Sequence, residues 1–401
     1  MVNLPLLWIS ALFYVALASA LYVGSAGIAW AVLRINGRGK LPSLTQAGRK
    51  RVLLAGLLLP PVLAVVPTIA GATLRHMHTG AQAMAAPRMA PSNAGAGSPF
   101  GSFSPEQTVP LEHHAMACQQ LFDRLALLGG LGMSGNLGRT VSIAVGGAAW
   151  LLVVAGLFLA ARLLWATLRL ERGIEPLLAS PTPKLGNSLE RVKRSCAALP
   201  RQRFFECAIP AAYSSVLGLW QARCVLSAQL VADAPDEELD AVVAHEGSHL
   251  RSGDVYATFL VGFLNCIFFF LRPVRLLSRL WREAAELGAD DAAVRATRDP
   301  LAMASAILRV SGVKASLLPA SLPAVALPFA DEAACSPAKR VERLLNQAQK
   351  ASLLPAAETH VQVAAGWIAT GMFALVGVGL LLSSEAACVA HCALELVQHF
   401  L

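Results

Sequence analysis

The sequence predicts a helical membrane protein with four transmembrane helices and an α+β domain on the cytoplasmic side. The 401 residues are 55% hydrophobic and only 14% charged, and the mean hydropathy is +0.55. This composition is typical of membrane proteins rather than soluble domains. Four apolar stretches are long enough to cross a bilayer of about 30 Å as helices. They are residues 6–33, 52–74, 141–165 and 363–382.

The first two stretches depart from a simple span. The first lacks a charged segment before it and exceeds the apolar length of a signal peptide, so we expect it to be retained. The second contains Pro60, Pro61 and Pro67. These prolines predict a kinked or partly broken helix.

Charge placement orients the predicted spans. Loop 34–51 contains six basic residues and no acidic residue, which places it in the cytoplasm by the positive-inside rule. The tail has Glu385 and Glu395 but no lysine or arginine, as expected outside. The predicted organisation is two transmembrane helices in 1–74, an extracytoplasmic and partly disordered loop 75–140, a third transmembrane helix 141–165, a cytoplasmic domain 166–361, a fourth transmembrane helix 362–383 and an extracytoplasmic tail 384–401.

The net charge of +8 reflects this topology. The predicted cytoplasmic domain holds 22 basic and 20 acidic residues and is therefore nearly neutral. A basic surface for nucleic acid is not needed to explain the excess, and we expect no direct nucleic-acid binding.

The pentapeptide His-Glu-Gly-Ser-His at 245–249 supplies most of a hydrolytic zinc centre. On a helix, His245 and His249 lie one turn apart on one face and can bind a single ion. Glu246 then reaches the metal-bound water as its general base. Residues 233–243 predict such a helix through their start signals and apolar spacing. The alternative is a chance match on an ordinary helix.

A second predicted helix, 282–294, supplies the missing ligand. Two histidines and an open water position need one more protein ligand, often a carboxylate. Glu286 is the predicted ligand, and Glu283 is the alternative. Asp290 lies four residues after Glu286 on the same face, where it can accept the outer N–H of a ligand histidine. A solvated acidic face without a metal is the other interpretation.

These motifs resemble those of the BlaR/MecR-type integral-membrane zinc peptidases, which are related to the CAAX-prenyl and heat-shock membrane proteases. The resemblance is carried by 245–254 and 286–290. Upstream, Ile209-Pro210-Ala211 and 216–227 are similar to the family's strand pair before the catalytic helix.

The resemblance implies a gluzincin-like peptidase domain, with two departures from the family pattern. Gly247-Ser248 replaces a bulkier pair, and no penicillin-binding sensor domain follows the last span. A helical glycine also costs about 1 kcal/mol relative to alanine. The implied site residues are His245, His249 and Glu286 as zinc ligands, Glu246 as the base, Asp290 behind the ligands and Asp254 in a supporting role.

A fifth apolar run, 256–271, is short for a span and is followed at once by Arg272. It predicts either a buried helix of the catalytic domain or a hairpin arm that enters the cytoplasmic leaflet. A complete crossing is excluded, because it would put Glu286 and His245 on opposite sides of the membrane.

The extracytoplasmic segments contain residues suited to soft metals such as copper, although alanine-rich loops collect such residues without a purpose. No cysteine has a CxxC partner, so a structural cysteine–zinc site is not expected. The tail cysteines could pair in an oxidising space, but their helical spacing is awkward for a disulfide. The residues concerned are His76, Met77, His78, Met84, Met89, His113, His114, Met116 and Cys118 in the loop, and Cys388 and Cys392 in the tail.

We therefore predict a zinc-dependent endopeptidase of the bacterial inner membrane, with both termini outside. Its partners would be membrane lipid and a protein or peptide substrate, such as a cytoplasmic repressor or the chain itself. We expect the substrate to lie extended beside a strand at 216–219. Arg340 is the candidate oxyanion donor; the alternative is a solvated helix start. The alternative functions are a housekeeping protease of the prenyl or heat-shock type, and a signalling or scaffold protein with a vestigial zinc site.

Overall fold

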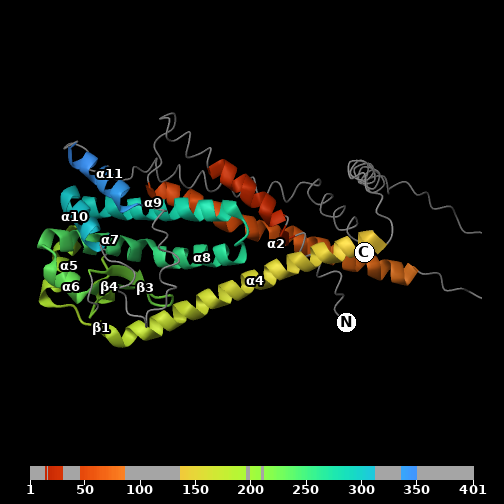
Figure 1. Cartoon of the computed structure of the whole chain (residues 1–401), viewed down its shortest axis with the longest axis horizontal. Coiled ribbons are helices and arrows are strands. Elements are labelled where there is room, and N and C mark those ends of the chain that lie inside the picture. Colours follow the sequence, from red (N-terminus) through yellow and green to blue (C-terminus); the bar gives the residue numbers. More distant parts are fainter. Residues whose placement is uncertain are drawn as a thin grey trace, which may run out of the picture. The chain divides into compact units, whose positions relative to one another are not determined.

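The computed structural model describes residues 14–15, 17–29, 46–85, 136–195, 199–208, 212–311 and 336–349. The chain divides into two compact units, and the larger one comprises Tyr22–Leu58 and Ala155–Phe373. Figure 1 shows its helices and strands. In chain order the elements are α2 (Gln46–Ala85), α4 (Asn136–Ile174), the 3-10 turn η1 (Glu175–Leu177), β1 (Leu178–Ala179), α5 (Pro183–Ser195), the 3-10 turn η2 (Arg201–Arg203), β2 (Phe204–Cys207), β3 (Ser214–Leu217), β4 (Arg223–Ser227), α6 (Ala228–Asp233), α7 (Asp236–Ser252), α8 (Asp254–Ile267), α9 (Arg272–Thr297), α10 (Pro300–Ser311) and α11 (Pro337–Gln349).

A small four-stranded sheet follows α4 in the larger unit. Its strand order is β1-β2-β4-β3. β2 and β4 are parallel, and the other two pairs are antiparallel. β3 is therefore an edge strand with one row of backbone groups unpaired by the sheet. Of the two segments expected to form a strand pair, 216–227 includes the end of β3 and all of β4, whereas 209–211 lies outside the described residues.

The β3–β4 turn depends on a glycine. Gly218 has a φ of +108°, and a Cβ at this position would collide with the backbone carbonyl of Gln221. Only glycine adopts this conformation without strain. The turn presents Trp220 with 76% of its surface exposed.

The core of the larger unit lies around α7, against which α5 and α10 both pack. Acidic residues 236–238 occupy the first turn of α7, where their negative charges interact favourably with the positive end of the helix dipole. Glu238 then binds α10, accepting hydrogen bonds from Ser305 Oγ and Arg309 Nε at 2.6 Å each. The predicted helix around the zinc motif is thus confirmed, and it is anchored at its start.

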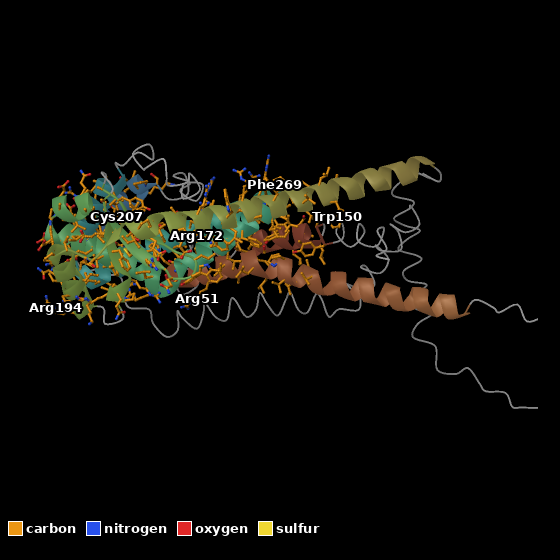
Figure 2. All side chains as sticks on the ribbon, turned by 90° about the horizontal axis from the view of Figure 1, so that it is seen from below. Arg51, Trp150, Arg172, Arg194, Cys207 and Phe269 are labelled. Atoms are coloured by element: carbon orange, nitrogen blue, oxygen red, sulfur yellow. The ribbon has the colours of Figure 1, made fainter. Side chains whose placement is uncertain are left out.

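Helices α8 and α9 form an antiparallel hairpin (Figure 1). A Cβ on Gly156 of α4 would lie 2.6 Å from the carbonyl oxygen of Ile267, so α4 and the end of α8 approach closely. Phe268 packs edge-on against Tyr22, with ring centroids 5.1 Å apart. In Figure 2, Phe269, which follows α8, lies farther from Cys207 than Arg172 of α4 does. The chain therefore turns back after α8, in agreement with the expectation that 256–271 does not cross completely.

Among the described residues, one helical stretch, Trp150–Leu177, is long and apolar enough to cross a membrane. It overlaps the predicted third span, which lies within α4. The predicted second span lies within α2, which continues as one helix through Pro60, Pro61 and Pro67.

Both long helices extend beyond their predicted ends. Residues 75–85 and 136–140 are helical, although they were expected in the extracytoplasmic loop. Backbone hydrogen bonds continue a helix past the apolar segment, so hydropathy does not mark its end.

Several predicted features lie outside the described residues. They are the fourth span, Ile209-Pro210-Ala211, the tail cysteines Cys388 and Cys392, and the loop residues Met89, His113, His114, Met116 and Cys118.

Candidate metal centre

The two histidines of the motif face one another from one side of α7. Their Nε2 atoms lie 3.2 Å apart, and their rings are nearly perpendicular. The side chains of His245 and His249 are only 10% and 13% exposed. The i, i+4 spacing on a continuous helix produces this arrangement, as the sequence predicted.

Glu286 of α9 completes a three-residue cluster with the histidines. Its Oε2 lies 3.6 Å from His245 Nε2, and its Oε1 lies 3.7 Å from His249 Nε2. One donor atom from each residue falls within 4.8 Å of the other two. Glu283, the alternative ligand, lies outside this cluster. Two imidazoles and a carboxylate are a donor set suited to zinc, with a fourth position open to water. The residues therefore fit the metal.

An aspartate stands behind each histidine. Asp290, which is fully buried, has its Oδ1 3.1 Å from His245 Nδ1, although the angle falls outside that of a regular hydrogen bond. Asp254 Oδ2 lies 2.8 Å from His249 Nδ1. A carboxylate on the outer nitrogen holds the ring orientation and leaves Nε2 free to bind a metal. Both aspartates thus occupy the positions expected for them.

Arg340 of α11 joins Glu286 and Asp290, two acidic residues of α9. Its Nη1 lies 2.8 Å from Glu286 Oε2. Its Nη2 and Nε donate to Asp290 Oδ1 and Oδ2 at 2.6 and 2.9 Å. The side chain is only 13% exposed. Arg340 is therefore not a solvated residue at a helix start.

The remaining member of the motif, Glu246, points toward the sheet. Ser214 Oγ of β3 donates to Glu246 Oε1 at 2.7 Å. Sequence analysis did not identify Ser214, because nothing in its neighbourhood marks it as different from other strand serines. The edge strand thus holds the candidate base directly.

Gly247, the first departure from the family pattern, has a packing reason. A Cβ at this position would collide with the Cδ1 atom of Leu199, a buried residue just before β2. The motif helix therefore lies close to the segment that leads into the sheet. A bulkier residue would require Leu199 to move.

A comparison with protein-family models gives an independent result. Residues 142–322 match the model of the BlaR1 peptidase M56. This region of the chain is similar to the BlaR1-type M56 peptidases. The match begins in α4 and continues past α10, so it includes the histidine motif and Glu286. Comparisons with curated proteins and with solved structures found no significant match.

The M56 assignment indicates a metallopeptidase in a family of membrane proteins. The match confirms the family that the motifs resemble. It also agrees with the apolar stretch Trp150–Leu177, all of which lies inside the matched region.

Neighbouring charged residues shift the pKa values of the candidate ligands. Burial lowers the pKa of His245, but the nearby carboxylates of Asp290 and Glu286 outweigh it and raise this pKa to about 10. Burial raises the pKa of Glu286, yet His245, Arg340 and His249 together hold it far below its usual range. Metal binding must therefore displace a proton from His245, and the carboxylate is already ionised.

The two supporting aspartates are held ionised in a similar way. Burial opposes ionisation of Asp254, but His249 and Lys50 outweigh it and keep its pKa below the ordinary value. For Asp290, burial is outweighed by His245 and Arg340. Each aspartate can therefore accept hydrogen bonds from its histidine.

A cavity of about 580 Å³ opens over the histidines and Glu286. Its walls come from the last turns of α4, from β3 and the following turn, and from α7, α8, α9 and α10. Its lining residues include Leu170, Ser214, Val216, Leu219, Glu246, Phe259, Met303, Ile307 and Arg340. The cavity is mostly apolar away from the ligands, and a polypeptide segment could enter it beside β3.

Proposed function

We propose that this protein is an integral-membrane, zinc-dependent endopeptidase whose zinc ligands are His245, His249 and Glu286. The observation that carries the proposal is the convergence of these side chains from α7 and α9, within 4.8 Å of one another. The M56 family match supports the metallopeptidase activity. The donor set supports zinc over magnesium or calcium, which prefer oxygen ligands.

In the proposed peptide hydrolysis, Glu246 carries out the proton transfers. When bound, zinc supplies Lewis acidity that favours ionisation of a water molecule and polarises the peptide carbonyl. Glu246 accepts the proton from the attacking water and delivers it to the nitrogen of the leaving amine. Ser214 donates to Oε1 of Glu246 and so orients the carboxylate.

The substrate is proposed to bind as an extended strand along the free edge of β3. The edge offers unpaired backbone N–H and C=O groups, and the cavity includes β3 residues 214–217 beside the histidines. Strand addition of this kind aligns a peptide bond through main-chain hydrogen bonds, while side-chain pockets select its residues.

Arg340 has two roles in this proposal. In the structure it binds the carboxylates of Glu286 and Asp290, so it fixes the ligand and the aspartate behind His245. It also lines the cavity. A guanidinium that lines the cavity can donate hydrogen bonds to a developing oxyanion.

The proposed topology has four transmembrane helices and a cytoplasmic catalytic domain. The charge distribution supports it, because loop 34–51 has six basic residues and no acidic residue, as expected of a cytoplasmic loop, whereas the tail has no lysine or arginine. The substrate would then be a cytoplasmic or membrane-adjacent protein, such as a repressor or the chain itself.

The test combines metal analysis with proteolysis. Purified wild-type protein should contain one zinc per chain and should cleave candidate cytoplasmic regulators or an unstructured protein such as casein. Glu246→Gln should keep the zinc and lose activity at least 100-fold, on the order expected for loss of a general base.

Two glutamates of α9 provide a matched pair for the ligand assignment. Glu286→Gln should lose zinc, whereas Glu283→Gln should keep it, because only Glu286 lies in the three-residue cluster. A wild-type protein without zinc, or a Glu246→Gln variant as active as wild type, would refute the proposed function and favour a vestigial site.

A further inference from the structure

The buried carboxylate of Asp254 has two partners from distant parts of the chain. Its Oδ2 lies 2.8 Å from Nδ1 of the ligand His249. Its Oδ1 accepts from Lys50 Nζ at 2.5 Å. Lys50 lies in the first turns of α2, 204 residues before Asp254, and its side chain is only 19% exposed. The sequence indicated Lys50 only as part of the basic cytoplasmic loop.

The corner between α7 and α8 directs Asp254 back toward the metal ligands. Gly253 ends α7 with a φ of +68°, and α8 begins at the next residue. This left-handed residue interrupts the helix between α7 and α8, and Asp254, the first residue of α8, reaches His249 five positions earlier. Asp254 is 6% exposed, and both of its oxygens are engaged.

Lys50 controls how this carboxylate is held. A carboxyl group rotates readily about its terminal torsion unless both oxygens are fixed. Removal of one partner from a buried ion pair also leaves an uncompensated charge, which is costly. With Lys50 absent, Asp254 would rotate or draw in water, and His249 Nδ1 would lose a fixed acceptor. The orientation of the His249 ring would then be set less firmly.

We propose that Lys50 is a positioning residue of the zinc site, which acts through Asp254 to hold His249 in its ligand orientation. This inference rests on the proposed function, since it takes His249 to be a zinc ligand. It makes α2, outside the matched peptidase region, a part of the metal centre.

Zinc affinity and cobalt spectra test this proposal on the purified full chain. Zinc dissociation constants would be measured by competition with a chromophoric chelator, and visible absorption would be recorded for the cobalt-substituted protein. Lys50→Met should bind zinc about 3- to 10-fold more weakly, which is less than the 10- to 100-fold typical of a direct partner of a ligand. Its cobalt bands should also shift, because the coordination geometry changes.

Three further variants control the result. Lys50→Arg retains a charged donor and should recover most of the affinity and the wild-type spectrum. Lys193→Met removes a lysine from the exposed face of α5 and should change neither. Asp254→Asn with Lys50→Met should be no weaker than Asp254→Asn alone, because both changes act on one contact.

The outcomes separate this proposal from simple electrostatics and from the proposed function. If Lys50 acted only by repelling the cation, its removal would tighten zinc binding. Tighter or unchanged affinity in Lys50→Met, or additive losses in the double variant, overturns the positioning role. If Lys50→Met does not fold, a wild-type cobalt spectrum in Lys50→Gln overturns it instead. A wild-type protein that binds no zinc refutes the proposed function, whatever Lys50 does.

Discussion

Asp290 provides the most direct test of how the site is assembled. Its Oδ1 faces two donors, His245 Nδ1 at 3.1 Å and Arg340 Nη2 at 2.6 Å, and its Oδ2 faces a third, Arg340 Nε at 2.9 Å. In Asp290→Asn, the amide oxygen can replace Oδ1 and keep two of these contacts. The amide nitrogen must then face the N–H of Arg340, which creates one donor–donor contact.

The size of the effect follows from this count. Asp290→Asn keeps the acceptor for His245, so zinc affinity should fall about 10-fold, the lower end for a residue behind a ligand. Asp290→Ala loses all three contacts, so its zinc affinity should fall about 100-fold. These losses correspond to about 1.4 and 2.7 kcal/mol of binding free energy.

The assay is chelator competition for zinc at neutral pH, with the thermal midpoint of each variant measured in parallel. Asp291→Asn is the matched control. It removes the same charge from the neighbouring residue, which forms an ion pair with Arg343 instead. It should bind zinc as wild type does. Equal affinities for Asp290→Ala and wild type, or an equal loss in Asp291→Asn, would show that Asp290 does not orient His245.

Three other variants have defined outcomes. Ser214→Ala should keep zinc and lower kcat a few-fold, about 1 kcal/mol for one hydrogen bond to Glu246; an unchanged kcat at full zinc content contradicts this. Gly247→Ala should lower stability by about 1–2 kcal/mol, because overpacking against Leu199 exceeds the gain in helix propensity, and a raised thermal midpoint refutes it. Burial opposes ionisation of Glu238, but Arg309 and Ser305 hold its pKa below the ordinary value. Its stabilisation is therefore present above the unfolded-state pKa and lost as the pH falls through the folded-state value. Glu238→Gln should be less stable by about 1–2 kcal/mol at pH 7 and nearly equal to wild type once the pH is below the folded-state pKa of Glu238; a difference that stays constant as the pH is lowered rules the explanation out.

Local spacing made the histidine pair predictable. Positions i and i+4 of a helix share a face whatever the helix packs against, so His245 and His249 followed from five residues. Glu286 and Asp290 share a face of their helix for the same reason, because they are also four residues apart. That these two helices belong to one site could be inferred only from the chemistry of zinc and from the resemblance, because nothing local records contact between α7 and α9.

Residues whose role depends on a distant contact could not be found in this way. Ser214 and Lys50 are an ordinary strand serine and an ordinary loop lysine until the fold sets them beside Glu246 and Asp254. Gly247 counted against the helix when only helix propensity was considered. Its packing against Leu199 accounts for it.

The amino-acid sequence by itself determined the apolar character of the chain, the helix that presents two imidazoles, and the chemistry of a zinc peptidase, because these depend on residue type and short-range periodicity. Tertiary structure decided which carboxylates stand behind each histidine, that Arg340 binds Glu286 and Asp290, and that β3 is a free edge beside the base. Apart from His249 and Asp254, which are five positions apart, these contacts join residues 32 to 54 positions apart, and they are set by the packing of whole elements rather than by any local pattern.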